Sequence, residues 1–266
     1  MTRAPDYDQA ATVRALREVG LHDGEVVFAH AGVALLGVPA EGLDEATIGA
    51  AFLGAFREVL GTAGTLVLPA FTYSYTKGEV FDPAATPPTA AMGTLSSALW
   101  RHPDAARSLD PIFSVVAIGG GARELAASVV PGDCFGAGSI FARLLERDAA
   151  LLTIGVGGGA LTFIHHVEQS AAVPYRFLKR FRGTTVVDGV ARETEVLYNV
   201  RDLDDAHHAP YVDRVHADAR AQGILRVAPL GRGEVAMLRA REAERLVLEG
   251  LARDPDYLVR GSGGGA

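Results

Sequence analysis

The sequence has little cysteine, few aromatic residues and no long apolar run. Its single cysteine, Cys134, excludes an internal disulfide and fits a reducing compartment. No stretch of about 18 consecutive apolar residues occurs, so no membrane-spanning helix is predicted. Residues 1–20 place charges among short apolar stretches, which predicts a helix and not a signal peptide. We therefore expect a cytoplasmic protein with no membrane partner.

The chain also lacks an excess of basic residues. Its formal net charge is −7 over 266 residues. General nucleic-acid binding needs a basic surface, so we expect no nucleic-acid partner. The 48% of hydrophobic residues are enough to bury a large core. We predict a single domain over residues 1–258, followed by a flexible, glycine-rich tail at 259–266 that offers few side chains for packing.

Short apolar runs alternate with helical patterns through the first two-thirds of the chain. The apolar runs predict four strands, at 25–30, 65–69, 115–118 and 151–154. Helical spacing predicts helices over 43–60 and 139–146, the second capped by Ser139. Continuous apolar strands between helices are typical of an α/β fold, here a three-layer sandwich around a mixed, largely parallel sheet.

The pattern changes after residue 183. Alternating residues on both sides of an Asp-Gly pair predict a β-hairpin insertion over about 184–198. Two C-terminal helices, 211–222 and 239–253, are expected to follow, with a strand near 224–229 between them. No linker rich in proline or serine precedes the hairpin, so it belongs to the same domain.

The densest group of chemically useful side chains follows the strand that ends at Ile154 and a glycine-rich loop. Ligands of open α/β sheets bind at such strand ends. If a helix begins near Thr162, His165 and Glu168 share one face and His166 points elsewhere. A histidine can take a proton from an amine, and a carboxylate can fix its tautomer. The alternative is a capped helix with one buried and one exposed histidine.

Other chemistry is less well supported. Adjacent histidines cannot both bind one ion from a helix, so no metal is predicted at His165 and His166. The glycine loop after Ile154 resembles a dinucleotide fingerprint, but the acidic residue expected about twenty positions later is missing. No Gly-x-Ser-x-Gly elbow occurs, which argues against an α/β-hydrolase. A lone cysteine such as Cys134 is more often a buried hydrophobe than a nucleophile.

Two further segments could bind anions. The loop 135–139 could present backbone N–H groups to a phosphate or a carbonyl. A basic run follows Tyr175 and consists of Arg176, Lys179, Arg180 and Arg182. The simpler interpretation of this run is a solvated helix face. The alternative is a site for coenzyme phosphates or for a phosphorylated substrate.

Taken in order, five segments between about residues 24 and 182 resemble the aminoglycoside 3-N-acetyltransferase family. They are 30–37, 64–73, 107–114, 136–140 and the motif Thr162-x-x-His165-x-x-Glu168. The chain departs from the family pattern where Asp110-Pro111 replaces His-Pro, where Ile140 replaces a proline and where Ala31-Gly32 replaces two serines.

The resemblance implies a transferase, an N-acetyltransferase that uses acetyl-CoA (coenzyme A) as co-substrate and a small-molecule amine, such as an amino sugar or antibiotic, as acceptor. It implies that His165 is the general base and that Glu168 orients the imidazole or holds the amine. Expected coenzyme contacts are His30, Ala31, Gly32, Val33, Leu36, Gly37, Arg107, Ser108, Phe113 and Ser114. Expected substrate contacts are Tyr73, Tyr75, Asp110, Thr162, Tyr175 and Arg176.

Alternatives remain beside this hypothesis. The departures at Asp110 and at the segment after His30 would suit a relative that binds ligand without turnover. A coenzyme-independent acyltransferase or a hydrolase could use the same histidine–glutamate pair. The basic run fits an anionic acceptor better than a polycationic aminoglycoside. The acyl group and the oligomeric state are open, with a homodimer as one option.

Overall fold

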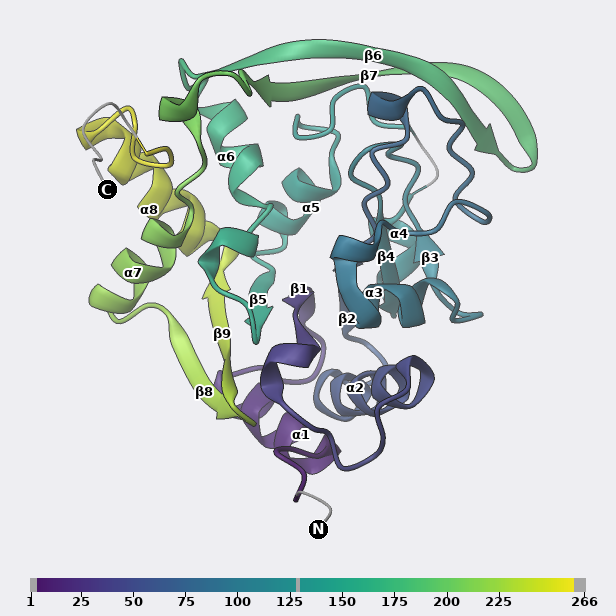
Figure 1. The fold of residues 1–266 in the computed structure, drawn as a ribbon, viewed down its shortest axis with the longest axis vertical. Coiled ribbons are helices and arrows are strands. Elements are labelled where there is room, and N and C mark those ends of the chain that lie inside the picture. Colours follow the sequence, from purple (N-terminus) through teal and green to yellow (C-terminus); the bar gives the residue numbers. More distant parts are fainter. Residues whose placement is uncertain (1–3, 128–129, 261–266) are drawn as a thin grey trace.

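The computed structural model describes residues 4–127 and 130–260 (Figure 1). The expected tail from residue 261 onward lies outside the described residues. The two preceding residues are packed against the protein. Val259 is 2% exposed and pairs with Pro210, and the Arg260 N–H donates a hydrogen bond to the Ala209 carbonyl (3.0 Å).

A mixed seven-stranded sheet forms the centre of the molecule, in the order β3-β4-β2-β1-β5-β9-β8. β1 pairs parallel with β2 and β5, and the other neighbours pair antiparallel. The strands are β1 (Val26–Ala31), β2 (Thr65–Pro69), β3 (Ala106–Arg107), β4 (Val115–Gly119), β5 (Ala150–Ile154), β8 (Arg226–Leu230) and β9 (Gly233–Arg239).

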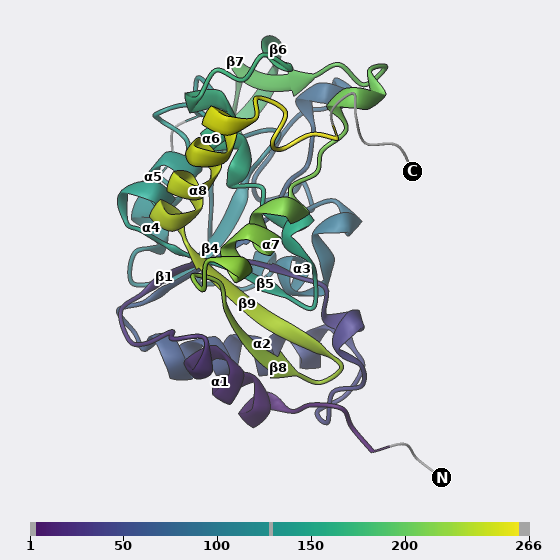
Figure 2. The same cartoon turned by 90° about the vertical axis from the view of Figure 1, so that its left-hand side faces the viewer.

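Helices cover both faces of this sheet and produce three layers (Figures 1 and 2). One face is covered by α1 (Gln9–Glu18), α2 (Glu45–Leu60) and α3 (Gly93–Trp100). The other face is covered by α4 (Ala122–Leu125), α5 (Ile140–Glu146), α6 (Ile164–Ser170), α7 (Asp213–Ala221) and α8 (Ala240–Arg253). Short 3₁₀ turns are η1 (Val33–Leu36), η2 (Tyr75–Lys77), η3 (Ala90–Met92), η4 (Gly158–Ala160) and η5 (Ala206–His208).

The two cores follow from strand geometry. Successive residues of a strand point to opposite faces of the sheet. Val27 and Ala29 of β1 accordingly pack under α1 to α3, whereas Phe28 packs under the helices of the other face. The predicted three-layer α/β sandwich around a mixed sheet is confirmed, but the sheet is not largely parallel, because only the pairs of β1 with β2 and β5 run parallel among the described strands. None of the helices in the described part of the chain is long and apolar enough to cross a bilayer.

A long hairpin arches across one end of the molecule (Figure 1) and consists of β6 (Arg176–Val187) and β7 (Val190–Arg201). Its two-residue turn lies at Asp188-Gly189, as predicted, and both residues have positive φ angles (51° and 75°). The Tyr75 hydroxyl anchors the hairpin through hydrogen bonds to Thr185 (2.7 Å) and Thr194.

Two predictions about this region were wrong. The hairpin extends beyond 184–198 at both ends, and the basic run that starts at Arg176 lies on strand β6 and not on a helix. Strand β9 was not expected at all. Charged residues mask the strand pattern at the start of β6, and the Ala, Met and Leu residues of β9 also favour a helix. By contrast, the Ser139 hydroxyl caps α5 as expected, because it accepts a hydrogen bond from the Ala142 N–H (3.2 Å).

Candidate active site

The loops that follow β1 and β5 lie side by side and lead to the candidate site. The Gly32 N–H donates a hydrogen bond to the Ile154 carbonyl (2.9 Å), which joins the two strand ends. Gly155 has a φ of +68°, and a Cβ there would lie 2.8 Å from the Gly32 carbonyl oxygen. Only glycine fits such a close approach with this backbone conformation. The glycine run therefore brings the start of α6 next to the end of β1.

His165 and Glu168 lie on one face of α6, as their spacing predicted. His165 Nδ1 is 2.6 Å from Glu168 Oε2, and the two side chains are 22% and 1% exposed. An ionised carboxylate can only accept hydrogen bonds, so we assign the hydrogen to Nδ1. This tautomer leaves the lone pair on Nε2. The arrangement provides a base whose orientation is set by a buried carboxylate.

Arg176, the first residue of β6, forms a second buried contact with the same carboxylate. Its Nε is 2.7 Å from Glu168 Oε2, and the Arg176 side chain is only 4% exposed. Burial by itself would raise the pKa of Glu168, but the charges and hydrogen bonds of His165 and Arg176 hold this pKa below its usual value. Glu168 is therefore ionised at neutral pH. The structure buries Arg176 against Glu168, whereas the sequence suggested that it contacts the substrate.

His166 points away from this pair and contacts the loop that precedes α5. It is 6% exposed, and its Nδ1 donates a hydrogen bond to the Phe135 carbonyl (2.6 Å). The Phe135 ring in turn packs edge-on against the His165 imidazole, with the ring centroids 5.4 Å apart. The loop 135–139 thus holds both histidines. Sequence reasoning missed the role of Phe135, because a contact between distant segments leaves no local pattern.

His30, at the end of β1, has a different environment. It is 8% exposed, and its Nε2 lies 3.2 Å from the Thr162 hydroxyl. Burial lowers the pKa of His30 to about 3, so the ring is uncharged at neutral pH. The Thr162 carbonyl accepts a hydrogen bond from the His165 N–H (3.1 Å). The structure therefore brings His30, Thr162 and the base together.

An aromatic cluster lies next to the base. Tyr73 has a φ of +56°, which is uncommon for a residue other than glycine and typical of functional sites. Its ring centroid is 5.5 Å from that of Phe113, and the Tyr198 ring lies 4.9 Å from Phe113 and 6.1 Å from Phe135. Burial raises the pKa of Tyr198 to about 12, so this phenol stays neutral. Tyr198 comes from β7 and was not predicted.

Three other predicted substrate contacts, Tyr75, Asp110 and Tyr175, are buried in the protein. Asp110 is 3% exposed, and its Oδ1 accepts hydrogen bonds from the Ile112 and Phe113 N–H groups (2.8 Å each). Burial raises the pKa of Asp110. The Tyr75 hydroxyl is bonded to the hairpin. Tyr175 is 4% exposed, and burial together with the nearby Glu168 raises its pKa. The predicted contacts of these three side chains with a substrate stay predictions.

The predicted coenzyme contacts fall into two groups. Three polar side chains tie β3 and β4 to the loop after β2: Arg107 Nη2 donates to the Ala70 carbonyl (2.9 Å) and to the Ser114 hydroxyl (3.1 Å), and the Ser108 hydroxyl accepts from the Val115 N–H (2.9 Å). The second group follows β1. Here Val33 and Leu36 are buried, and Ala31, Gly32 and Gly37 are partly exposed.

Cys134 is part of the core. It is fully buried, and its Sγ lies 3.6 Å from Asp110 Oδ1. Burial raises the pKa of the Cys134 thiol well above its usual value. A thiol in this environment is a poor nucleophile. Among the residues that the structure describes, no three His, Cys, Asp or Glu side chains are placed to hold a metal ion.

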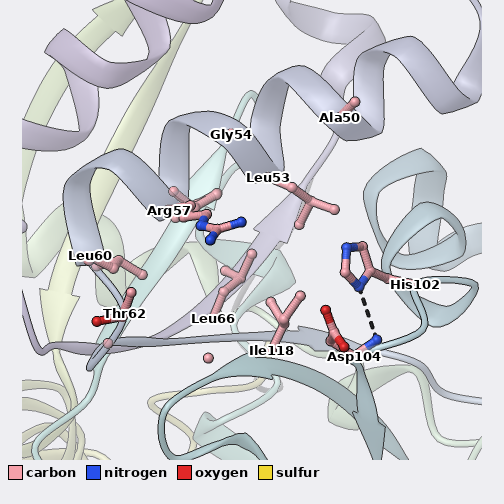
Figure 3. A pocket seen from close by; sticks show the side chains of 14 residues that line it. Ala50, Leu53, Gly54, Arg57, Leu60, Thr62, Leu66, His102, Asp104 and Ile118 are labelled. Atoms are coloured by element: carbon pink, nitrogen blue, oxygen red, sulfur yellow. Dashed lines mark hydrogen bonds between the residues drawn. The ribbon is translucent and has the colours of Figure 1, made fainter.

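A separate cavity of about 540 Å³ lies between α2 and the sheet (Figure 3). Its lining residues are Ala50, Leu53, Gly54, Phe56, Arg57, Leu60, Gly61, Thr62, Gly64, Leu66, His102, Asp104, Ile118 and Gly119. None of them was predicted as a site residue. His102 Nδ1 accepts a hydrogen bond from the Asp104 N–H (3.2 Å), and the described residues supply no carboxylate partner for its ring. The histidine–carboxylate pair of His165 and Glu168 therefore has no counterpart among the lining residues of this cavity.

Comparison with known proteins shows the family of the chain. The family model for aminoglycoside 3-N-acetyltransferases matches residues 28–251. Aminoglycoside N(3)-acetyltransferase IV from a Salmonella species is 28% identical over 260 residues, which cover 98% of this chain and 93% of that protein. The solved apoenzyme of aminoglycoside acetyltransferase AAC(3)-IVa has 26% identity and a TM-score of 0.79, and the match covers 100% of this chain and 95% of that one.

A structure described as AAC-IIIb binary with CoASH shares the fold, with a TM-score of 0.79 and 22% identity over 92% of this chain and 96% of that one. Since the family model covers most of the sequence, the chain belongs to the aminoglycoside 3-N-acetyltransferase family. It is an N-acetyltransferase.

Proposed function

We propose that the protein transfers an acetyl group from acetyl-CoA to an amino group of an amino sugar, with His165 as the general base. The observation that carries this proposal is the 2.6 Å contact between His165 Nδ1 and the buried carboxylate of Glu168. The acceptor class follows the relatives, which are named aminoglycoside N(3)-acetyltransferases. The donor class is supported by the CoASH-bound protein of the same fold.

The chemistry requires one proton to be moved and returned. His165 Nε2 accepts a proton as the amine nitrogen attacks the thioester carbonyl, and a C–N bond forms. The ionised Glu168 stabilises the imidazolium that results. Collapse of the tetrahedral intermediate breaks the C–S bond. His165 then returns the proton to the leaving thiolate, so that the products are the amide and free coenzyme A.

The end of β1 offers a suitable place for the coenzyme. The loops 31–37 and 155–159 are rich in glycine, which permits a close approach of a ligand. Leu35 is 62% exposed there and provides apolar surface. His30 Nδ1 is a buried polar atom without a partner in the described part of the protein. We infer that the acetyl thioester lies between this region and His165 Nε2.

The test is an assay of thiol release from acetyl-CoA with a panel of amines. The panel contains aminoglycosides and amino sugars that carry a phosphate or a carboxylate, and mass spectrometry identifies the acetylated product. We expect thiol release that requires both the coenzyme and one class of amine. Thiol release without an amine would indicate a hydrolase. No release with any amine, together with no binding of coenzyme A by calorimetry, would refute the proposal.

A further inference from the structure

We propose that Arg176 is a positioning residue for the general base. It keeps Glu168 in place as a carboxylate, so that the hydrogen of the His165 imidazole stays on Nδ1 and Nε2 stays free to accept a proton. This inference rests on the proposed function. It replaces the contact between Arg176 and the substrate that the sequence suggested.

The first observation is that two nitrogen atoms lie close to one carboxylate oxygen, one in a hydrogen bond and one in an ion pair. Glu168 Oε2 lies 2.6 Å from His165 Nδ1 and 2.7 Å from Arg176 Nε. Arg176 Nη2 lies only 3.1 Å from His165 Nδ1. Nδ1 cannot both donate to Glu168 and accept from Arg176, and the shorter of the two contacts, with Glu168, favours the hydrogen on Nδ1. Removal of the guanidinium would leave that oxygen with its hydrogen bond to His165 and without the Arg176 contact.

The second observation is that the hairpin holds Arg176 in place. Arg176 begins β6, and its Nη1 donates a hydrogen bond to the Asn199 carbonyl on β7 (3.2 Å). The Cys134 N–H donates to the Leu197 carbonyl of the same strand (2.9 Å). Together with the Tyr75 anchor, these bonds fix the guanidinium relative to α6. The geometry of the base thus depends on the hairpin as well as on the helix that carries it.

The third observation is electrostatic. A buried carboxylate needs a nearby positive charge to stay ionised. His165 is positive only after it has taken the proton, whereas an arginine is positive throughout the reaction. The other titratable groups beside Glu168 are Tyr175 and Tyr198, and both are neutral, because burial raises their pKa values. Arg176 is therefore the cation that faces Glu168 before the proton is transferred.

Loss of this cation has a definite consequence. An unopposed buried carboxylate either takes a proton itself or attracts one to the adjacent imidazole. Protonated Glu168 no longer requires the hydrogen on Nδ1, and an imidazolium has no lone pair for the amine. Each outcome removes the reactive form of His165 at neutral pH. The binding of acetyl-CoA is not affected in either case.

The experiment compares three variants of the full chain. Arg176→Met removes the charge, and Arg176→Lys retains a charge without the planar donors. Arg180→Met is the matched control, because Arg180 lies on the same strand but is exposed and pairs with Glu195. For Arg176→Met we expect kcat to fall about 100-fold while KM for acetyl-CoA stays within about 2-fold. We expect Arg176→Lys or added guanidinium to recover part of kcat, and Arg180→Met to keep the wild-type pH profile and imidazole signals.

Two further readouts separate positioning from simple damage to the fold. The acidic limb of the pH profile of kcat should move to higher pH by about 1 unit in Arg176→Met. The imidazole ¹⁵N signals of His165 should show Nδ1–H in the wild type and an altered tautomer or an imidazolium in the variant. If Arg176→Met does not fold, the pH profile and the ¹⁵N signals of Arg176→Lys test the positioning role instead.

Wild-type kcat, pH profile and ¹⁵N signals in a folded Arg176→Met protein would overturn the proposal. The NMR measurement does not require a substrate. If the wild type acetylates no amine, the proposed function fails, and the imidazole signals still decide the role of Arg176.

Discussion

Two histidines near the carboxyl ends of the central strands have opposite electrostatic environments. His30, at the end of β1, is buried without a carboxylate, and burial lowers its pKa to about 3. His165, at the start of α6, is 22% exposed and is hydrogen bonded to the ionised Glu168. The two regions are joined through Thr162, which contacts both histidines. Proximity to the site therefore does not distinguish a base from a structural residue.

A neighbouring negative charge does distinguish the proposed base, His165, from His30. An imidazole that must gain a proton during catalysis needs a neighbouring group that stabilises the cation. Glu168 supplies this stabilisation to His165, and nothing comparable is placed at His30 in the described residues. Burial without a counter-charge also keeps the thiol of Cys134 neutral. The comparison predicts that loss of His165 or Glu168 affects the acetyl transfer step. Loss of His30 should affect stability and coenzyme binding more than kcat, and loss of Cys134 should affect mainly the fold.

The largest expected effect comes from His165→Ala. This change removes the base, so we expect kcat for acetyl transfer to fall about 1000-fold. Steady-state thiol release measures the loss, and calorimetry with coenzyme A together with thermal unfolding shows that binding and fold persist. A variant that retained more than a tenth of the wild-type kcat would show that another group accepts the proton.

Glu168→Gln should have the next largest effect. The amide has a similar shape but no charge, so it neither fixes the Nδ1 hydrogen nor stabilises the imidazolium, and we expect kcat to fall about 100-fold. The control is Glu195→Gln, which makes the same change in an exposed ion pair with Arg180 and Arg182 on the hairpin. Exposed ion pairs contribute little, so the control should behave as the wild type. Equal kcat values for the two variants would contradict the role of Glu168.

His30→Gln should change the dependence of stability on pH. The folded-state pKa of His30, about 3, lies below the ordinary value of 6.5, so the unfolded chain binds the proton more readily between these values. The contribution of His30 to the free energy of unfolding is complete above about pH 6.5. It is lost as the pH falls, by about 1.4 kcal/mol per pH unit. The variant should lack this slope, while kcat changes less than about 10-fold.

Denaturant unfolding at several pH values between 5 and 7.5 tests this prediction. The matched control is His102→Gln, because His102 lies partly exposed at the cavity under α2. The control should keep the wild-type slope. An unchanged slope in His30→Gln would mean that His30 titrates normally in the folded protein.

Cys134→Ala should have the smallest effect on the chemistry. The thiol is fully buried beside Asp110 and is held neutral, so we expect kcat to change less than about 2-fold. In the wild type, iodoacetamide should label Cys134 only after unfolding, as followed by mass spectrometry. Rapid labelling of the native protein, or a large loss of kcat, would contradict the assignment of Cys134 to the core.

Much of the fold could be predicted because its signals are local. The apolar runs that became β1, β2, β4 and β5 have the length of buried strands, and the Asp188-Gly189 pair marks the hairpin turn. Strand β9 could not be predicted in this way, because its Ala, Met and Leu residues also favour a helix and it runs directly into α8. The error at Arg176 has a different cause. Charged residues mask the strand pattern at the start of β6, which pairs with the end of β7 so that Arg176 lies opposite Arg201.

The candidate site also combines features that local sequence patterns predict with features that they do not. The spacing of His165 and Glu168 implies a shared helix face, and the structure has this geometry. The contributions of Phe135 and Tyr198 come from other segments and carry no local pattern. Three residues expected to meet the coenzyme, Arg107, Ser108 and Ser114, have partners inside the protein, and their contacts with coenzyme A stay predictions.

The sequence by itself determined the elements whose cause is short-range: the buried strands, the capped helices, the Asp-Gly turn and the histidine–glutamate pair on one helix face. Only the tertiary structure decided which charges are buried together. Glu168 becomes a stable carboxylate because Arg176, from another element, lies 2.7 Å away in a region with little water. Charge interactions of this kind depend on distance and burial, and both are set when segments remote in the sequence pack against each other.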